Sequence, residues 1–115
     1  MFKRFLLLLV VLGMMLAGAV AAQDEMAPTV ALGGTDELGP FLTDAAGMTL
    51  YIFTRDELGV SNCAGDCAAA WPPLTVEEGV NPTAGPGVSG VLGVIARDDG
   101  TRQVTHNGWP LYYYM

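Results

Sequence analysis

The sequence is poor in basic residues. It has five Lys and Arg against twelve Asp and Glu in 115 residues, a formal net charge of −7 at pH 7. Lys3 and Arg4 both stand in the first 22 residues, so residues 23–115 keep three Arg against all twelve acids, a charge of −9. Such a charge repels nucleic acid and anionic lipid. We expect no nucleic-acid partner, and an envelope protein or a cation as the kind of partner that fits.

The groups on which most enzymes depend are also scarce. His106 is the only histidine, and no Lys follows residue 22. The sequence contains no Gly-x-Ser-x-Gly, His-Glu-x-x-His or Cys-x-x-Cys pattern. Few side chains could therefore act as a general acid or base near neutral pH. The sequence predicts a protein that is not an enzyme.

The one long apolar run stands at the N-terminus. Lys3 and Arg4 precede an apolar run over residues 5–16, and small residues follow up to Ala22. This order is typical of a secretory signal peptide, here residues 1–22, and the run is too short to span a bilayer comfortably. No Cys lies near the cleavage point for lipid attachment, so we expect no stable membrane anchor after cleavage. The remainder, residues 23–115, is expected to be a single exported domain in the periplasm or outside the cell.

An internal repeat organises that domain. Residues 47–56 read G-M-T-L-Y-I-F-T-R-D, and residues 108–114 read G-W-P-L-Y-Y-Y. An offset of 61 residues places Leu50 on Leu111 and Tyr51 on Tyr112. A repeat of this kind sets the architecture. We expect the two tyrosine segments to share one sheet or one core, related by an approximate two-fold axis.

The pattern of residue types predicts a mostly β fold, a small antiparallel sheet or sandwich with one short helix. The strongest strand signal covers residues 48–54, which are apolar on both faces and should be covered on both sides. Asp98-Asp99-Gly100 and Asn107-Gly108 predict hairpin turns, and hence a β-meander at the C-terminus. The helix is expected at residues 63–71, which are rich in Ala and end at Pro72. Other expected strands are 29–32, 41–43, 74–76, 91–97, 102–105 and 109–114, with loops at 33–40, 55–62 and 77–90.

Three blocks of sequence carry a resemblance to a known family. They begin G-P-F-L-T-D-A-A-G-M-T-L-Y-I-F-T-R-D at Gly39, S-N-C-A-G-D-C-A-A-A-W-P-P-L at Ser61 and Q-V-T-H-N-G-W-P-L-Y-Y-Y at Gln103. In this order they resemble the bacterial secreted repeat and predicted lipoprotein family, of unknown function, which is described by the motif Tyr-x-(Phe/Trp/Tyr)-x-x-Asp. The resemblance implies export and a repeat fold.

The family motif selects five residues. The first copy matches at Tyr51, Phe53 and Asp56, and the second at Tyr112 and Tyr114. The second aspartate would fall at position 117, so we expect the domain to be truncated at its C-terminus. Aromatics at strand spacing are usually cross-strand core pairs, and the alternative is an aromatic platform for a ligand. An aspartate after a strand most often accepts backbone N–H bonds in a turn, and the alternative is cation coordination.

Cys63 and Cys67 are the only cysteines, and export places them in an oxidising compartment. Four residues apart, they lie on one face of the predicted helix, within reach of a local disulfide. The alternative is a copper site made of Cys63, Cys67 and His106, because thiolate and imidazole suit that metal.

Two functions follow. The first is a non-catalytic binding or envelope interaction module without a cofactor. The alternative is a periplasmic redox or copper-handling protein.

Overall fold

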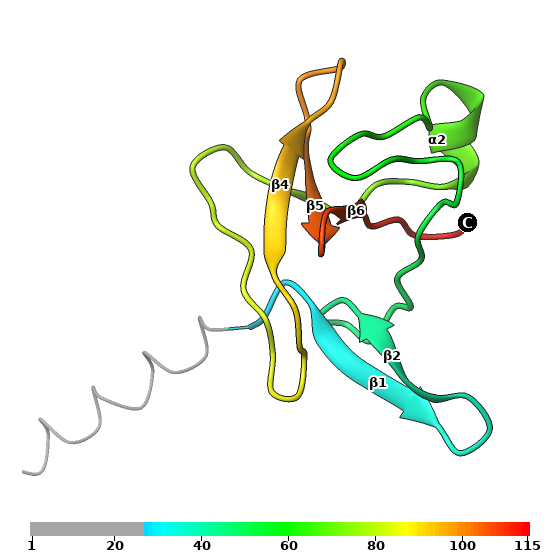
Figure 1. Cartoon of the computed structure of the whole chain (residues 1–115), viewed down its shortest axis with the longest axis vertical. Coiled ribbons are helices and arrows are strands. Elements are labelled where there is room, and N and C mark those ends of the chain that lie inside the picture. The colour runs from blue at the N-terminus through cyan, green and yellow to red at the C-terminus, as the bar shows by residue number, and fades with distance from the viewer. Residues whose placement is uncertain (1–26) are drawn as a thin grey trace, which may run out of the picture.

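The computed structural model describes residues 27–115, and the predicted signal peptide lies outside the described residues. These residues form one short helix, labelled α2 in Figure 1, and six short strands. In order, the elements are β1 (Ala31–Thr35), β2 (Gly39–Thr43), α2 (Asp66–Ala70), β3 (Thr75–Val76), β4 (Leu92–Ala96), β5 (Arg102–His106) and β6 (Trp109–Pro110). Among the residues described, no helix is long and apolar enough to cross a membrane.

The predicted mostly β fold is confirmed, and the strands form two antiparallel sheets. β1 pairs with β2 in one sheet, and β5 lies at the centre of the other, between β4 on one side and β3 and β6 on the other. In Figure 1 the β1–β2 hairpin projects from the lower part of the molecule and the β4–β5 hairpin from the upper part.

The internal repeat is visible as two units with the same layout. The first unit consists of β1, β2 and residues 48–53, and the second consists of β4, β5 and residues 109–114. Each hairpin closes over three residues, through the Thr35–Gly39 pair in the first unit and the Arg97 N–H bond to the Thr101 carbonyl in the second. In each unit the chain then returns along the second strand of the hairpin. The sequence repeat is therefore a structural repeat.

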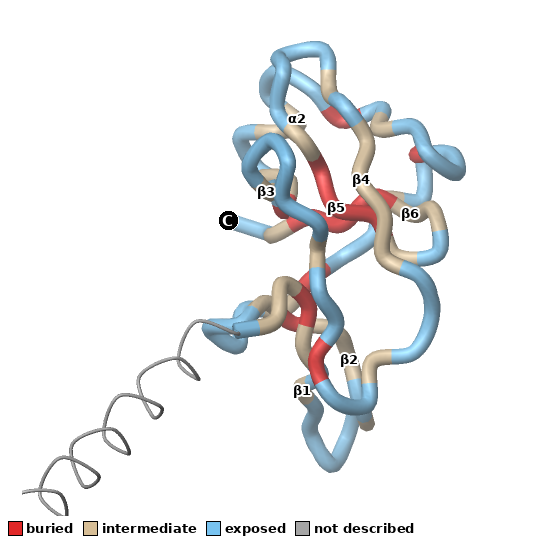
Figure 2. The backbone as a smooth tube through the Cα atoms, turned by 90° about the vertical axis from the view of Figure 1, so that its left-hand side faces the viewer, coloured by how far each residue is buried: buried red, intermediate tan, exposed pale blue. Residues whose placement is uncertain are grey.

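The core joins the two units. Val30 and Leu50 come from the first unit and its lead-in, Val104 and Leu111 from the second, and Leu74 from the segment between them. All five are buried. Figure 2 shows the buried positions gathered along β5 and at the meeting of the two units.

Leu74 ties this core together through its backbone. Its N–H donates to the Leu111 carbonyl at 3.0 Å, Leu111 donates to Val104 at 3.0 Å, and Val104 donates back to Leu74 at 2.8 Å. The three bonds form a closed ring. A buried backbone group without a partner would cost about 1–3 kcal/mol, so the ring lets Leu74 sit between β5 and the C-terminal segment at no such cost.

The turn at Asn107-Gly108, which joins β5 to β6, has the backbone conformation that its two residues predict. Asn107 and Gly108 both have positive φ, 51° and 86°, as a two-residue hairpin of the primed type requires. The Asn107 side chain also accepts the Val91 N–H at 2.9 Å. This turn sets the register in which Trp109 lies opposite His106.

Several predicted boundaries are wrong. Residues 48–54 form isolated bridges, Thr49 to Thr43 and Tyr51 to Tyr112, and no continuous strand. They are also not covered on both sides, since Ile52 is 50% exposed. The reason is that this segment bonds to β2 through Leu50 and to the C-terminal segment through Tyr51, so it pairs with neither over enough residues to form a regular strand. The expected loop at 33–40 belongs largely to the β1–β2 hairpin, and the expected strand at 109–114 is regular only in β6. The helix begins at Asp66 because Gly65, with φ 59°, stands at its N-cap.

Candidate functional site

The two motif copies meet at their tyrosines. Tyr51 and Tyr112 form an antiparallel bridge in which each N–H donates to the other carbonyl, both at 2.8 Å. Because these residues are equivalent in the repeat, the pair lies on a local two-fold axis. The surroundings differ, however. The Tyr112 side chain is fully buried, whereas Tyr51 is 41% exposed.

Asp56 provides the buried Tyr112 hydroxyl with a hydrogen-bond acceptor. The Tyr112 hydroxyl donates to Asp56 Oδ2 at 2.6 Å, and the Asn62 N–H donates to Oδ1 at 2.7 Å. The aspartate of the first motif thus binds the tyrosine of the second. Asp56 is buried, and its two oxygens are satisfied by these donors. Burial first, and then the Asp56 hydrogen bond, raise the pKa of Tyr112.

The network continues to Arg97. Ser61 Oγ lies 2.6 Å from the Tyr112 hydroxyl and accepts from Arg97 Nη1 at 2.9 Å. Arg97 Nη1 also donates to Gln103 Oε1 at 2.8 Å, and Nη2 donates to the Cys63 carbonyl at 2.6 Å. A carboxylate and a guanidinium are therefore joined through two hydroxyl groups. Such a network holds the loop of residues 57–65 against β5.

The predicted disulfide is confirmed. Cys63 and Cys67 are bonded, with their Cα atoms 5.2 Å apart. The bridge joins the end of the loop of residues 57–65 to the first turn of α2, and within that loop Cys63 is buried.

His106 lies away from any cluster of metal ligands. Its Nε2 is 2.7 Å from the Ser89 carbonyl. Within residues 27–115, no three His, Cys, Asp or Glu side chains come close enough to hold a metal ion. The copper alternative therefore finds no preformed ligand set in this part of the chain.

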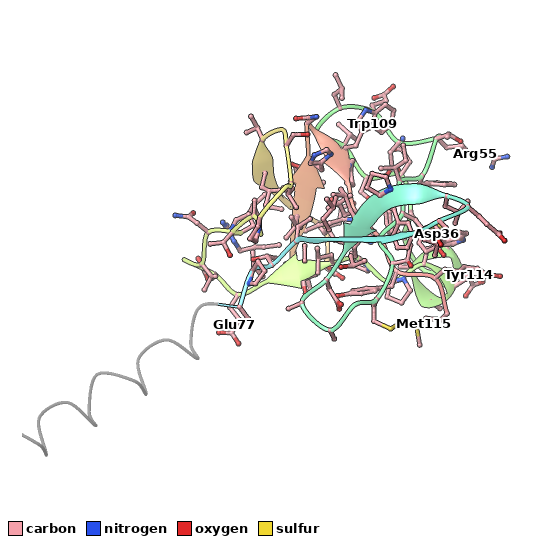
Figure 3. The ribbon with its side chains drawn as sticks, turned by 90° about the horizontal axis from the view of Figure 1, so that it is seen from below. Asp36, Arg55, Glu77, Trp109, Tyr114 and Met115 are labelled. Carbon is pink, nitrogen blue, oxygen red and sulfur yellow. A yellow bond between two sulfur atoms is a disulfide. The ribbon has the colours of Figure 1, made fainter. Side chains whose placement is uncertain are left out.

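An aromatic group lies at the surface beside the motif tyrosines. The Tyr51 ring meets the Trp71 ring edge to face at 5.6 Å, and Trp71 lies 4.4 Å from the Tyr114 ring. Tyr114 is 58% exposed, and Figure 3 shows it at the edge of the molecule with Met115. We call Tyr51, Trp71 and Tyr114 the aromatic surface. Phe53 is separate from it, packing edge to face on Tyr112 at 6.4 Å.

A cleft of about 570 Å³ lies beside the network, and Ser61 and Arg97 contribute to its lining. The loop of residues 59–65 forms one wall, and the β4–β5 turn forms the other with Asp98 and Asp99. Arg97 lies in its lining, but the hydrogen bonds described above direct its guanidinium into the network.

The comparison with protein families supports the repeat seen in the fold. A family model described as a secreted repeat of unknown function matches residues 34–75 and 93–115, more than half of the chain. The chain belongs to this family. The two matched stretches cover most of both structural units and the segment through Leu74. The family description also supports export. No curated protein and no solved structure matches the chain.

Sequence reasoning singled out the motif residues but missed their partners. Ser61, Arg97 and Gln103 carry the network, and Trp71 stands at the centre of the aromatic surface. A clue to Arg97 was available, because it is one of only three Arg after residue 22 and is the last residue of the expected strand 91–97. Nothing local in the sequence indicates that Ser61 joins it.

Proposed function

We propose that the protein is an exported, non-catalytic binding module of the cell envelope, and that the aromatic surface contacts a protein partner. The observation that carries this proposal is the exposure of Tyr51 and Tyr114, 41% and 58%, on either side of Trp71. Tyr and Trp are the residues most enriched at the centres of protein interfaces. Their rings offer apolar area, and their polar tips tolerate solvent in the free protein.

The surroundings of the surface support the same proposal. Met115, which follows Tyr114 and lies with it at the edge of the molecule in Figure 3, is 78% exposed. Exposed apolar groups that lie together mark interaction sites more often than scattered ones do. The acidic balance of the chain favours a neutral or basic partner.

The alternative of a redox or copper-handling protein has less support. A copper site requires free thiolates, whereas Cys63 and Cys67 are bonded to each other, and His106 binds the Ser89 carbonyl. A redox role is compatible with the disulfide, but the burial of Cys63 restricts the access of a partner thiol. We therefore place binding first.

Site-specific photo-crosslinking in cells tests the proposal. A benzophenone side chain at position 114 should form a discrete adduct with an envelope protein, and the Tyr51→Ala change should remove that adduct. Leu38, 77% exposed at the tip of the β1–β2 hairpin, is the control position and should give none. Equal adducts from both positions would contradict the proposal.

A further inference from the structure

The two units also differ in what lies beside residues 48–53 in the first unit and residues 109–114 in the second. In the second unit, residues 70–76 fill the gap between β5 and the C-terminal segment. Leu74 bridges it, accepting from the Val104 N–H and donating to the Leu111 carbonyl. Farther along, Tyr113 donates to Pro72 at 2.7 Å and Met115 donates to Ala70 at 3.0 Å.

The equivalent gap in the first unit has no such segment. Leu50 donates to the Leu42 carbonyl at 2.9 Å, as Leu111 donates to Val104. In an antiparallel ladder the N–H and the carbonyl of one residue point to the same side. Because the Leu42 carbonyl faces Leu50, the Leu42 N–H also points away from β1. No backbone hydrogen bond among residues 27–115 reaches the Leu42 N–H, the Leu50 carbonyl or either backbone group of Ile52. We call these groups the open fork.

The side chains around the open fork are apolar and accessible. Met48 and Ile52 are 52% and 50% exposed, and Leu32, paired opposite Leu42 across the hairpin, is 44% exposed. An unpaired strand edge with apolar side chains is a template on which another strand can pair. Extended peptides bind to such edges through main-chain hydrogen bonds, while side-chain pockets supply specificity.

We propose that the open fork binds an extended segment of another protein by strand addition, with an aliphatic residue preceded by prolines in the place that Leu74 takes in the second unit. Pro72 and Pro73 show why prolines suit this position. In the second unit the contacts are made by the Pro72 carbonyl and by the N–H and carbonyl of Leu74. None of them uses a backbone N–H at position 72 or 73, which proline lacks. The inference deepens the proposed binding function and rests on it.

A second copy of this chain fits the open fork less well than a separate protein does. Its own residues 70–76 are already held in its second unit by Val104, Leu111 and Tyr113, and its Leu74 is only 6% exposed. Supplying them to a neighbour would break those bonds and expose that core residue. The occupant is therefore a segment that is not folded into a unit of its own.

A synthetic peptide with the sequence of residues 70–76, Ala-Trp-Pro-Pro-Leu-Thr-Val, is the direct probe. Titrated into the protein, it should bind saturably and slow amide hydrogen exchange at Leu42 and Ile52. The matched control peptide has an ester in place of the amide between its second proline and the leucine, which removes the N–H that would reach the Leu50 carbonyl and adds no bulk. It should bind about tenfold more weakly, as expected for one lost hydrogen bond.

A protein variant makes the test independent of the peptide. Ile52→Pro removes a donor of the open fork and should abolish binding. Leu58→Pro is its control, because residue 58 is exposed and is the second residue of the turn closed by Val60 and Glu57, where proline is favoured. It should bind like the unchanged protein.

Four results would overturn the inference. Equal affinity of the two peptides would exclude the main-chain bond. Changed exchange at Val104 and Tyr113 instead of Leu42 and Ile52 would mean that the peptide only displaces the native segment. Dimers in sedimentation that disappear in Ile52→Pro would assign the fork to a second copy. Binding that needs the Tyr51 ring but not the leucine N–H also overturns strand addition, and would leave the proposed function standing.

Discussion

Equivalent tyrosines in the two motif copies have acquired different environments. Tyr112 is buried against Asp56 and Ser61, so its hydroxyl fixes the meeting of the two units. Tyr51 has the same backbone bond but an exposed ring, so its side chain is available for contact. One motif position therefore serves stability in one copy and, in our proposal, binding in the other.

Removing the Tyr112 hydroxyl should expose this difference. Tyr112→Phe leaves Asp56 Oδ2 buried without its 2.6 Å donor, and we expect a loss of about 1–3 kcal/mol in the free energy of unfolding. Tyr51→Phe is the matched control at the equivalent position and should change that free energy by less than about 0.5 kcal/mol. Urea denaturation measures both. Equal losses would mean that the network contributes nothing beyond ring packing.

Short elements and turns were the most predictable part of the fold. The hairpin at Asn107-Gly108 follows from backbone preferences that two residues carry by themselves. The segment around Tyr51 could not be predicted in the same way. It bonds to Leu42 through Leu50 and to Tyr112 through Tyr51, and no local pattern shows that a strand will divide between partners so distant in sequence.

In the site, too, local features could be predicted from the sequence and contacts between distant segments could not. The cysteine pair is local, so spacing and compartment predicted the disulfide. The link from Asp56 to Arg97 passes through residues from three parts of the chain, and only the fold brings them together. The motif indicated Asp56 and Tyr112 as important without indicating that they bind each other.

The disulfide should contribute modestly to the stability of the loop and α2. It closes a loop between residues only four apart, and a short loop lies at the low end of the entropic effect. We expect the double change Cys63→Ser and Cys67→Ser to cost about 1–3 kcal/mol in the free energy of unfolding. A reductant should destabilise the unchanged protein by a similar amount and leave the variant unaffected. Alkylation without reductant that finds two free thiols in the exported protein would contradict this prediction.

At the scale of the whole molecule, the two units are joined largely through tyrosines of the C-terminal segment. Tyr112 bonds to Asp56, and the Tyr113 hydroxyl donates to Asp44 Oδ2 at 2.8 Å, so both reach carboxylates that follow the first unit's strands. Burial first, and then hydrogen bonding to Asp44, raise the pKa of Tyr113 well above its usual range. Each phenol must stay protonated to donate to its carboxylate.

This arrangement predicts a loss of stability in alkali. A tyrosine whose pKa is higher in the folded than in the unfolded protein contributes stability below about pH 10, the unfolded value, and loses it as the pH rises through the folded value. Ionisation in the folded protein would place phenolates against Asp44 and Asp56, and this repulsion is one of the causes that raise both pKa values. Denaturation midpoints should therefore fall steeply above pH 10, with phenolate absorbance rising together with unfolding.

Tyr113→Phe provides the decisive comparison, because it removes one ionisable link between the units and retains the ring. Its stability at neutral pH should be lower, since Asp44 loses the hydroxyl donor, but its further loss above pH 10 should be shallower than that of the unchanged protein. The Tyr114→Phe control keeps both the Tyr112–Asp56 and the Tyr113–Asp44 hydrogen bonds and should retain the full alkaline loss. If Tyr113→Phe and the unchanged protein lost stability with the same slope, the joining of the units would not depend on the protonated phenol of Tyr113.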